Sequence, residues 1–89
     1  MANPVYTHAE QIRIASSHGQ DINYLVCYGY VDWKRDTNMR PAVYVLMEYR
    51  GKVSYDTPPH ITTDKNPDGS TDFEKVMTAI NELKVKYSL

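Results

Sequence analysis

The stretch from Ile22 to Trp33 constrains the fold of this chain more than any other segment. Almost all of its residues are β-branched, aromatic or aliphatic, a composition that favours a strand over a helix. Both of its alternating faces are apolar: one carries Leu25, Cys27, Val31 and Trp33, and the other carries Ile22, Tyr24, Val26, Tyr28 and Tyr30. A strand with one wet face alternates apolar and polar residues, so we expect this one to be covered twice or to form part of an interface.

More strands are predicted after this one. Residues 34–41 are polar and contain a proline, which predicts a loop. Apolar side chains alternate along residues 42–49, which predicts a second strand, and residues 50–52 predict a tight turn into a third strand beginning at Val53. Because neighbouring strands joined by short connections usually pair, we expect an antiparallel sheet.

The clearest helix signal lies near the C-terminus. Residues 71–74 match a capping box, in which a threonine hydroxyl and a glutamate carboxylate satisfy unpaired backbone amides. The apolar residues that follow recur at three- and four-residue spacing and form one stripe: Phe73, Val76, Met77, Ile80, Leu83 and Tyr87. We predict an amphipathic helix that packs across one face of the sheet, and we assign the face carrying Leu25 and Cys27 to the core beneath it.

The segment before the first strand has two interpretations. Thr7 to Glu10 also matches a capping box and favours a short helix over residues 8–18. Ile12 and Ile14 alternate with polar residues, which favours a strand instead. We therefore predict an α+β fold with three to four antiparallel strands and a C-terminal helix, in the order αβββα, with ββββα as the alternative.

Composition limits the class of protein. Eighty-nine residues form one domain, 1–89, and ten basic against eleven acidic residues exert no strong pull on nucleic acid or anionic membranes. A single cysteine fits a reducing compartment, and no signal peptide or long apolar stretch is visible, so we expect a cytoplasmic protein that does not enter a membrane. No phosphate-binding glycine loop or nucleophile elbow occurs, so we predict neither an enzyme nor a bound cofactor.

The segment 64–72 resembles the calcium loop of EF-hand proteins, because oxygen-bearing side chains occupy loop positions one, three, five and nine with a glycine at six. Those oxygen-bearing residues are Asp64, Asn66, Asp68 and Asp72. Position twelve, however, holds Lys75 in place of the bidentate glutamate. The sequence Asn-Pro-Asp-Gly is a strong turn former, so we predict a turn followed by a helix cap, with a calcium site as the alternative.

Tyrosine is the unusual component, with eight copies. We expect a platform on the sheet face opposite the C-terminal helix, with cations at its end; it comprises Tyr24, Tyr28, Tyr30, Tyr44, Lys34, Arg35 and Arg40. Tyrosine suits interfaces because its ring is buried while its hydroxyl stays wet. We therefore predict a small non-catalytic protein-binding or regulatory module that self-associates as a homodimer, such as a phage-type accessory or inhibitor protein. The alternative is a single-stranded nucleic-acid binder, since aromatic side chains beside cations stack bases.

Overall fold

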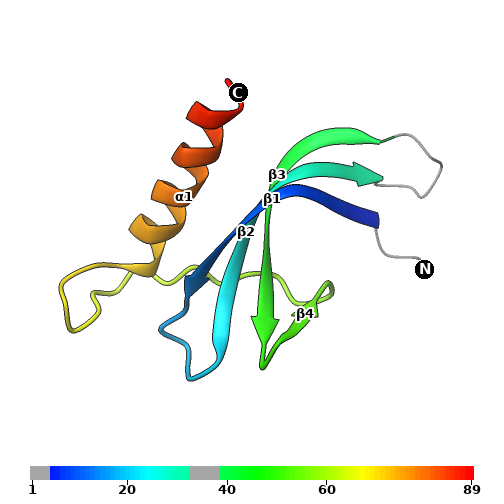
Figure 1. The fold of residues 1–89 in the computed structure, drawn as a ribbon. Helices are drawn as coiled ribbons and strands as arrows, with labels where there is room; N and C mark the ends of the chain where they lie inside the picture. Colours follow the sequence, from blue (N-terminus) through cyan, green and yellow to red (C-terminus); the bar gives the residue numbers. More distant parts are fainter. Residues whose placement is uncertain (1–4, 33–38) are drawn as a thin grey trace.

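A computed structural model of the chain describes residues 5–32 and 39–89. It contains four strands, β1 (Val5–Ala15), β2 (Ile22–Asp32), β3 (Arg40–Tyr49) and β4 (Lys52–Ser54), followed by one helix, α1 (Asp72–Lys86). The strands form one antiparallel sheet in the order β1-β2-β3-β4, and α1 lies on one side of it (Figure 1). The α+β fold with a small antiparallel sheet and a C-terminal helix is confirmed.

The helix predicted over residues 8–18 is wrong, because this segment belongs to β1. It pairs with β2 from Val5 to Ala15, so its backbone groups on that side are satisfied by the sheet. The Thr7 hydroxyl donates to the Tyr30 carbonyl at 3.4 Å instead of capping a helix. Glu10 contacts Lys86 and Tyr87 at the end of α1. The element order is therefore ββββα.

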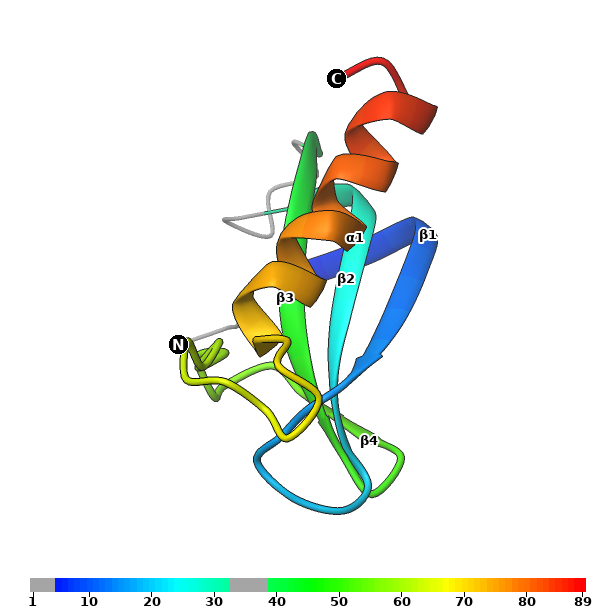
Figure 2. The same cartoon turned by 90° about the vertical axis from the view of Figure 1, so that its left-hand side faces the viewer.

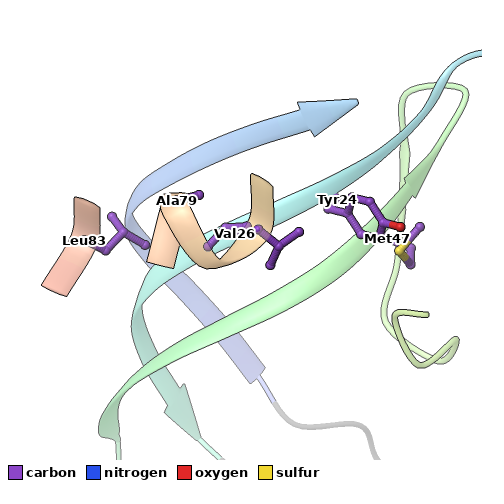
Figure 3. Close-up of a cluster of buried hydrophobic side chains, with 6 residues drawn as sticks. Tyr24, Val26, Met47, Ala79 and Leu83 are labelled. Carbon is purple, nitrogen blue, oxygen red and sulfur yellow. The ribbon is translucent and has the colours of Figure 1, made fainter. Parts of the chain in front are cut away.

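The two faces of β2 are also reversed relative to the prediction. Tyr24 and Val26 face α1 (Figure 3). Leu25 and Cys27 alternate with them along β2 and therefore lie on the other side. The buried cluster beneath the helix contains Tyr24, Val26, Met47, Val76, Ala79 and Leu83. The neighbouring strand decides this choice, because β1 places Ile12 and Ile14 beside Val26 and Tyr24 but Gln11 and Arg13 beside Cys27 and Leu25.

α1 begins after the predicted N-cap, Thr71. The Thr71 hydroxyl accepts a hydrogen bond of 3.0 Å from the Glu74 backbone amide and donates one of 3.3 Å to the Glu74 carboxylate, so the threonine half of the predicted capping box is confirmed. The apolar stripe is narrower than predicted, because Phe73 and Met77 are 47% and 48% exposed. At 100° per residue they lie on the helix flank away from Lys86, and Lys86 reaches Glu10 of β1. Phe73 and Met77 therefore face away from β1 and outside the core.

The sheet bends sharply, so that the start of β1, the end of β2 and the start of β3 turn away from α1 (Figures 1 and 2). A β-bulge in β1 between His8 and Glu10 lies opposite Gly29 of β2. A Cβ atom on Gly29 would lie 2.0 Å from the Thr7 carbonyl oxygen, so only glycine allows the two backbones to approach this closely. Bulges bend strands, and this pair of features accounts for the bend.

Candidate functional site

Three tyrosines gather on the concave face of the sheet, opposite α1. Tyr6 comes from β1, Tyr44 from β3 and Tyr55 from the residue after β4. The Tyr6 ring centroid lies 4.8 Å from that of Tyr44 and 5.8 Å from that of Tyr55, and the Tyr6 and Tyr55 rings are stacked with 21° between their planes. Tyr6, Tyr44 and Tyr55 are called the tyrosine cluster below. Because the cluster joins the two edge strands, it exists only in the bent sheet.

The three members of the cluster differ in their hydrogen bonds. The Tyr44 hydroxyl donates to the Thr7 carbonyl at 3.1 Å, the same oxygen that a side chain at Gly29 would strike. Burial, with the Cys27 thiol beside it, raises the pKa of Tyr44 above its ordinary value, so this hydroxyl stays protonated. The hydroxyls of Tyr6 and Tyr55 make no hydrogen bond within the described residues, and Tyr55 is 53% exposed. Tyr44 is thus the member of the cluster that is fixed to the backbone, and Tyr55 is the member that is exposed to solvent.

The four tyrosines of the predicted platform do not share one face of the sheet. Tyr24 is fully buried beneath α1, and Tyr28 packs against Tyr87, the residue that caps the end of α1, with ring centroids 4.4 Å apart. Tyr30 is exposed, but it lies two residues from Tyr28 and so shares the helix-side face of the sheet. Tyr44 lies on the opposite face. Of the predicted cations, Arg40 is exposed at the start of β3, and Lys34 and Arg35 lie outside the described residues.

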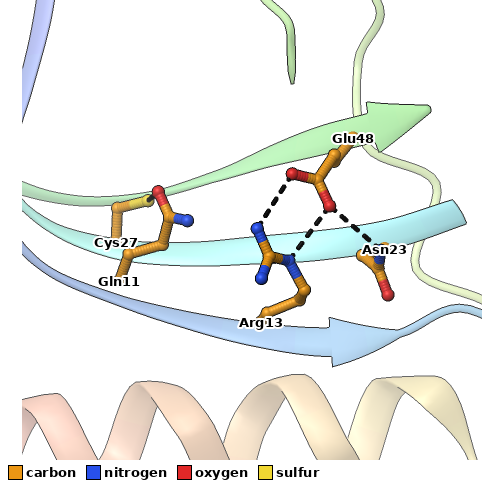
Figure 4. A network of polar contacts seen from close by, with 5 residues as sticks. All are labelled: Gln11, Arg13, Asn23, Cys27 and Glu48. Carbon is orange, nitrogen blue, oxygen red and sulfur yellow. Dashed lines mark hydrogen bonds and ion pairs between the residues drawn. The ribbon is translucent and has the colours of Figure 1, made fainter. Parts of the chain in front are cut away.

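A charged network occupies the other end of the concave face (Figure 4). The Arg13 guanidinium donates through Nε and Nη2 to both carboxylate oxygens of Glu48, each at 3.0 Å. The Asn23 side-chain amide donates to the same carboxylate at 3.0 Å. Hydrogen bonds from Arg13 lower the pKa of Glu48, which keeps it charged. The Glu48 side chain is 8% exposed and that of Arg13 is 56% exposed, so the guanidinium remains accessible from outside.

Cys27 lies buried between the network and the tyrosine cluster. Its Sγ lies 3.8 Å from both the Gln11 side-chain oxygen and the Leu25 carbonyl. Burial raises the pKa of the thiol to about 11, so it stays protonated and is a poor nucleophile.

The loop that resembles a calcium site uses its side chains within the protein. The Asp72 carboxylate is buried and accepts hydrogen bonds from the Ser17 amide, the Ser17 hydroxyl, the Tyr24 hydroxyl and the Asn66 amide, at 2.8–3.1 Å. Asp68 accepts from the Ser70 amide and hydroxyl. These contacts are those of a turn and a helix cap. Residues 5–32 and 39–89 contain no group of three or more His, Cys, Asp or Glu side chains placed to hold a metal.

Asp72 is charged despite its burial. Burial alone would raise the pKa of this carboxyl, but the bonds from the Ser17 amide, Tyr24 and Asn66 outweigh it and hold the pKa well below its usual range. Asp72 thereby joins the β1–β2 turn, β2 and the start of α1. The sequence places Asp72 at the start of the predicted helix, but it carries no signal that Tyr24 and Ser17, 48 and 55 residues away, bind this carboxylate.

Sequence reasoning missed Tyr6 and Tyr55 as parts of the site. Tyr6 precedes a segment interpreted as a helix, and Tyr55 follows the last short strand. The only available signal was their residue type, because the contact depends on the bend of the sheet. Recognising β1 as a strand would have placed Tyr6 beside Val31 and on the same face as Cys27.

The chain matches no known protein-family model, and no curated protein or solved structure resembles it significantly. Among the residues that the structure describes, α1 is too short and too polar to span a membrane.

Proposed function

We propose that this chain is a small, cytoplasmic, non-catalytic protein-binding module of the accessory or inhibitor type, and that it engages another protein through the tyrosine cluster. The observation that carries the proposal is the stack of the partly buried Tyr6 on the exposed Tyr55, on a sheet face that no described helix covers. Tyrosine is enriched among the residues that dominate binding energy at protein interfaces.

The cluster is suited to binding because it is held in place before a partner arrives. Tyr44 is fixed by its bond to Thr7 and packs against Tyr6, which in turn stacks on Tyr55. Rings that are already ordered lose little conformational freedom on association, so more of the contact energy appears as affinity. The hydroxyls of Tyr6 and Tyr55, which bond to no other described residue, can form hydrogen bonds to the partner.

The alternative of binding single-stranded nucleic acid has less support than protein binding. Tyr24 and Tyr28 would have to stack bases, but they pack beneath α1. The half-exposed Arg13 is neutralised by Glu48, and the chain has a net charge of −1. Without a basic track beside the aromatic rings, phosphate binding contributes little.

The test uses tagged full-length chain as bait in a lysate of its source cells, comparing the wild type with Tyr55→Ser and Tyr49→Ser. Tyr49 is the matched control because it is also exposed, but it lies two residues from Met47 and so shares the helix-side face of the sheet. We expect a protein retained by the wild type and Tyr49→Ser, and lost with Tyr55→Ser.

Purified partner and chain should then show a loss of affinity of about 30-fold or more for Tyr55→Ser, the range of an interface hot spot. Equal affinity of the wild type and Tyr55→Ser for every captured protein would overturn the proposal. Retention on single-stranded oligonucleotide resin at low salt, lost with Tyr55→Ser, would instead support the nucleic-acid alternative.

A further inference from the structure

Arg40 of β3 lies beside the tyrosine cluster on the concave face. Tyr6 pairs with Val31 of β2, and Val31 pairs in turn with Arg40. Residues that lie directly opposite one another share a face of the sheet, so Arg40 projects from the same side as Tyr6. Because neighbouring strands are about 4.8 Å apart, the Cα atoms of Tyr6 and Arg40 are about 10 Å apart. A group bound at the ring of Tyr6 is therefore within reach of the Arg40 side chain.

Arg40 is also a cation that no carboxylate of the described chain neutralises. The Asp, Glu, Lys and Arg residues at the paired strand positions of the concave face are Arg13, Arg40 and Glu48. Arg13 binds Glu48, whose side chain is 8% exposed (Figure 4). Arg40 is exposed, and its guanidinium bonds to no other described residue. Asp56 follows Tyr55 but lies outside the paired strands, so no register places its carboxylate on this face. The concave face therefore presents an open positive charge next to its aromatic rings.

We propose that this surface recognises a protein segment in which an aspartate or glutamate side chain lies close to an aromatic or aliphatic one. The apolar side chain packs against the rings of Tyr6 and Tyr55, and the carboxylate binds the Arg40 guanidinium, whose planar fork of N–H groups matches two carboxylate oxygens. Tyrosine and arginine are both enriched among the residues that dominate binding energy at interfaces. This recognition rests on the proposed function, because it uses the tyrosine cluster as the binding surface, and it adds the chemistry of the partner.

The arrangement of charge favours a carboxylate on a protein over a nucleic-acid strand. A strand carries a phosphate at every nucleotide and is held by a continuous track of cations. On the described part of this face, one open guanidinium accompanies the tyrosines, and Glu48 already occupies Arg13. One bidentate carboxylate is the anion that a single guanidinium satisfies.

The test selects phage-displayed random peptides on the immobilised full-length chain and then measures the affinity of synthetic copies by fluorescence anisotropy. We expect the selected peptides to be enriched in aspartate or glutamate near an aromatic or aliphatic residue. Arg40→Glu places like charges together and should weaken their binding by about tenfold or more at low salt. A peptide in which lysine replaces the acidic residue should bind Arg40→Glu more tightly than it binds the wild type, which demonstrates the direct pairing.

Lys52→Glu is the matched control for Arg40→Glu. It makes the same reversal of charge at an exposed position, but Lys52 pairs with Tyr49 and so lies on the helix-side face. Lys52→Glu should leave the affinity within about twofold of the wild type, since exposed charges more than a Debye length of about 10 Å apart are largely screened. Thermal unfolding should show that both variants fold, because both residues are exposed.

The outcomes separate this inference from the proposed function. Selected peptides without enrichment in acidic residues, or equal losses for Arg40→Glu and Lys52→Glu, would overturn the acidic partner. If those peptides still lose affinity with Tyr55→Ser, the tyrosine cluster remains a protein-binding surface. Peptides that bind Tyr55→Ser and the wild type equally would count against the cluster itself. Displacement of the peptides by a single-stranded oligonucleotide, lost with Arg40→Glu, would assign Arg40 to phosphate and overturn the choice of a protein segment.

Discussion

The hydroxyl of Tyr24 donates a hydrogen bond of 2.8 Å to the buried carboxylate of Asp72, and this bond joins the central strand to the first turn of the helix. Asp72→Asn removes the charge and places amide hydrogens among groups that are themselves donors. We expect a loss of about 2–4 kcal/mol in the free energy of unfolding, measured with urea at pH 7. The exposed Asp64→Asn is the control and should stay within about 0.5 kcal/mol of the wild type.

The same carboxylate predicts how stability depends on pH. The folded pKa of Asp72 lies below its unfolded value, so its contribution is fully present above the unfolded pKa of about 4 and is lost as pH falls below it. Urea unfolding between pH 7 and pH 3 should show a steeper loss of stability for the wild type than for Asp72→Asn. Parallel curves for the two proteins would contradict the assignment of a charged Asp72.

Gly29→Ala should destabilise the fold severely. The new methyl group would lie 2.0 Å from the Thr7 carbonyl oxygen and 2.6 Å from the His8 Cα, and both are backbone atoms that cannot move aside alone. We expect a cost of about 3 kcal/mol or more, at the upper end for overpacking. In Gly19→Ala the new methyl group meets only the flexible end of Ile22, at 3.3 Å, so this control should cost much less. Thermal unfolding of the two variants and the wild type measures the difference.

Two residues of the predicted helix stripe should respond differently to truncation. Leu83 is fully buried, so Leu83→Ala should cost about 2–5 kcal/mol of unfolding free energy. Phe73→Ala removes a larger side chain but one that is 47% exposed, and it should cost less than Leu83→Ala. An equal or greater cost for Phe73→Ala in urea unfolding would place Phe73 in the core after all.

Cys27 should be inert in the folded protein. Because its pKa is raised to about 11 and its side chain is buried, the thiolate fraction at pH 8 is about one in a thousand. Reaction with a thiol-specific chromogenic disulfide should be at least about a hundredfold slower in buffer than in 6 M urea. Comparable rates in the two conditions would mean that the concave face opens readily.

Local signals predicted the parts of the fold that depend on neighbours in sequence. The N-cap at Thr71 and the turn at Arg50-Gly51 are confirmed, and the turn residues adopt φ values of 52° and 82°. Thr7 to Glu10 carries the same capping pattern as Thr71 to Glu74, yet it forms a strand. Its fate depends on β2, a partner distant in sequence that the local pattern cannot reveal.

The reversed faces of β2 follow from that single error. Both faces are apolar, so β2 itself cannot show which one lies beneath the helix. The information resides in β1, where Ile12 pairs with Val26 and Arg13 pairs with Leu25. The tyrosine cluster was beyond reach for a related reason, because it depends on a bend that originates at Gly29.

The stack of Tyr6 on Tyr55 connects the first strand of the sheet to the residue that follows the last. In a flat sheet these two residues would lie on opposite margins, so their contact stabilises the curved form of the sheet. A partner that separates the two rings would remove this contact between the two margins. We therefore expect binding at this face to depend on the curvature of the sheet.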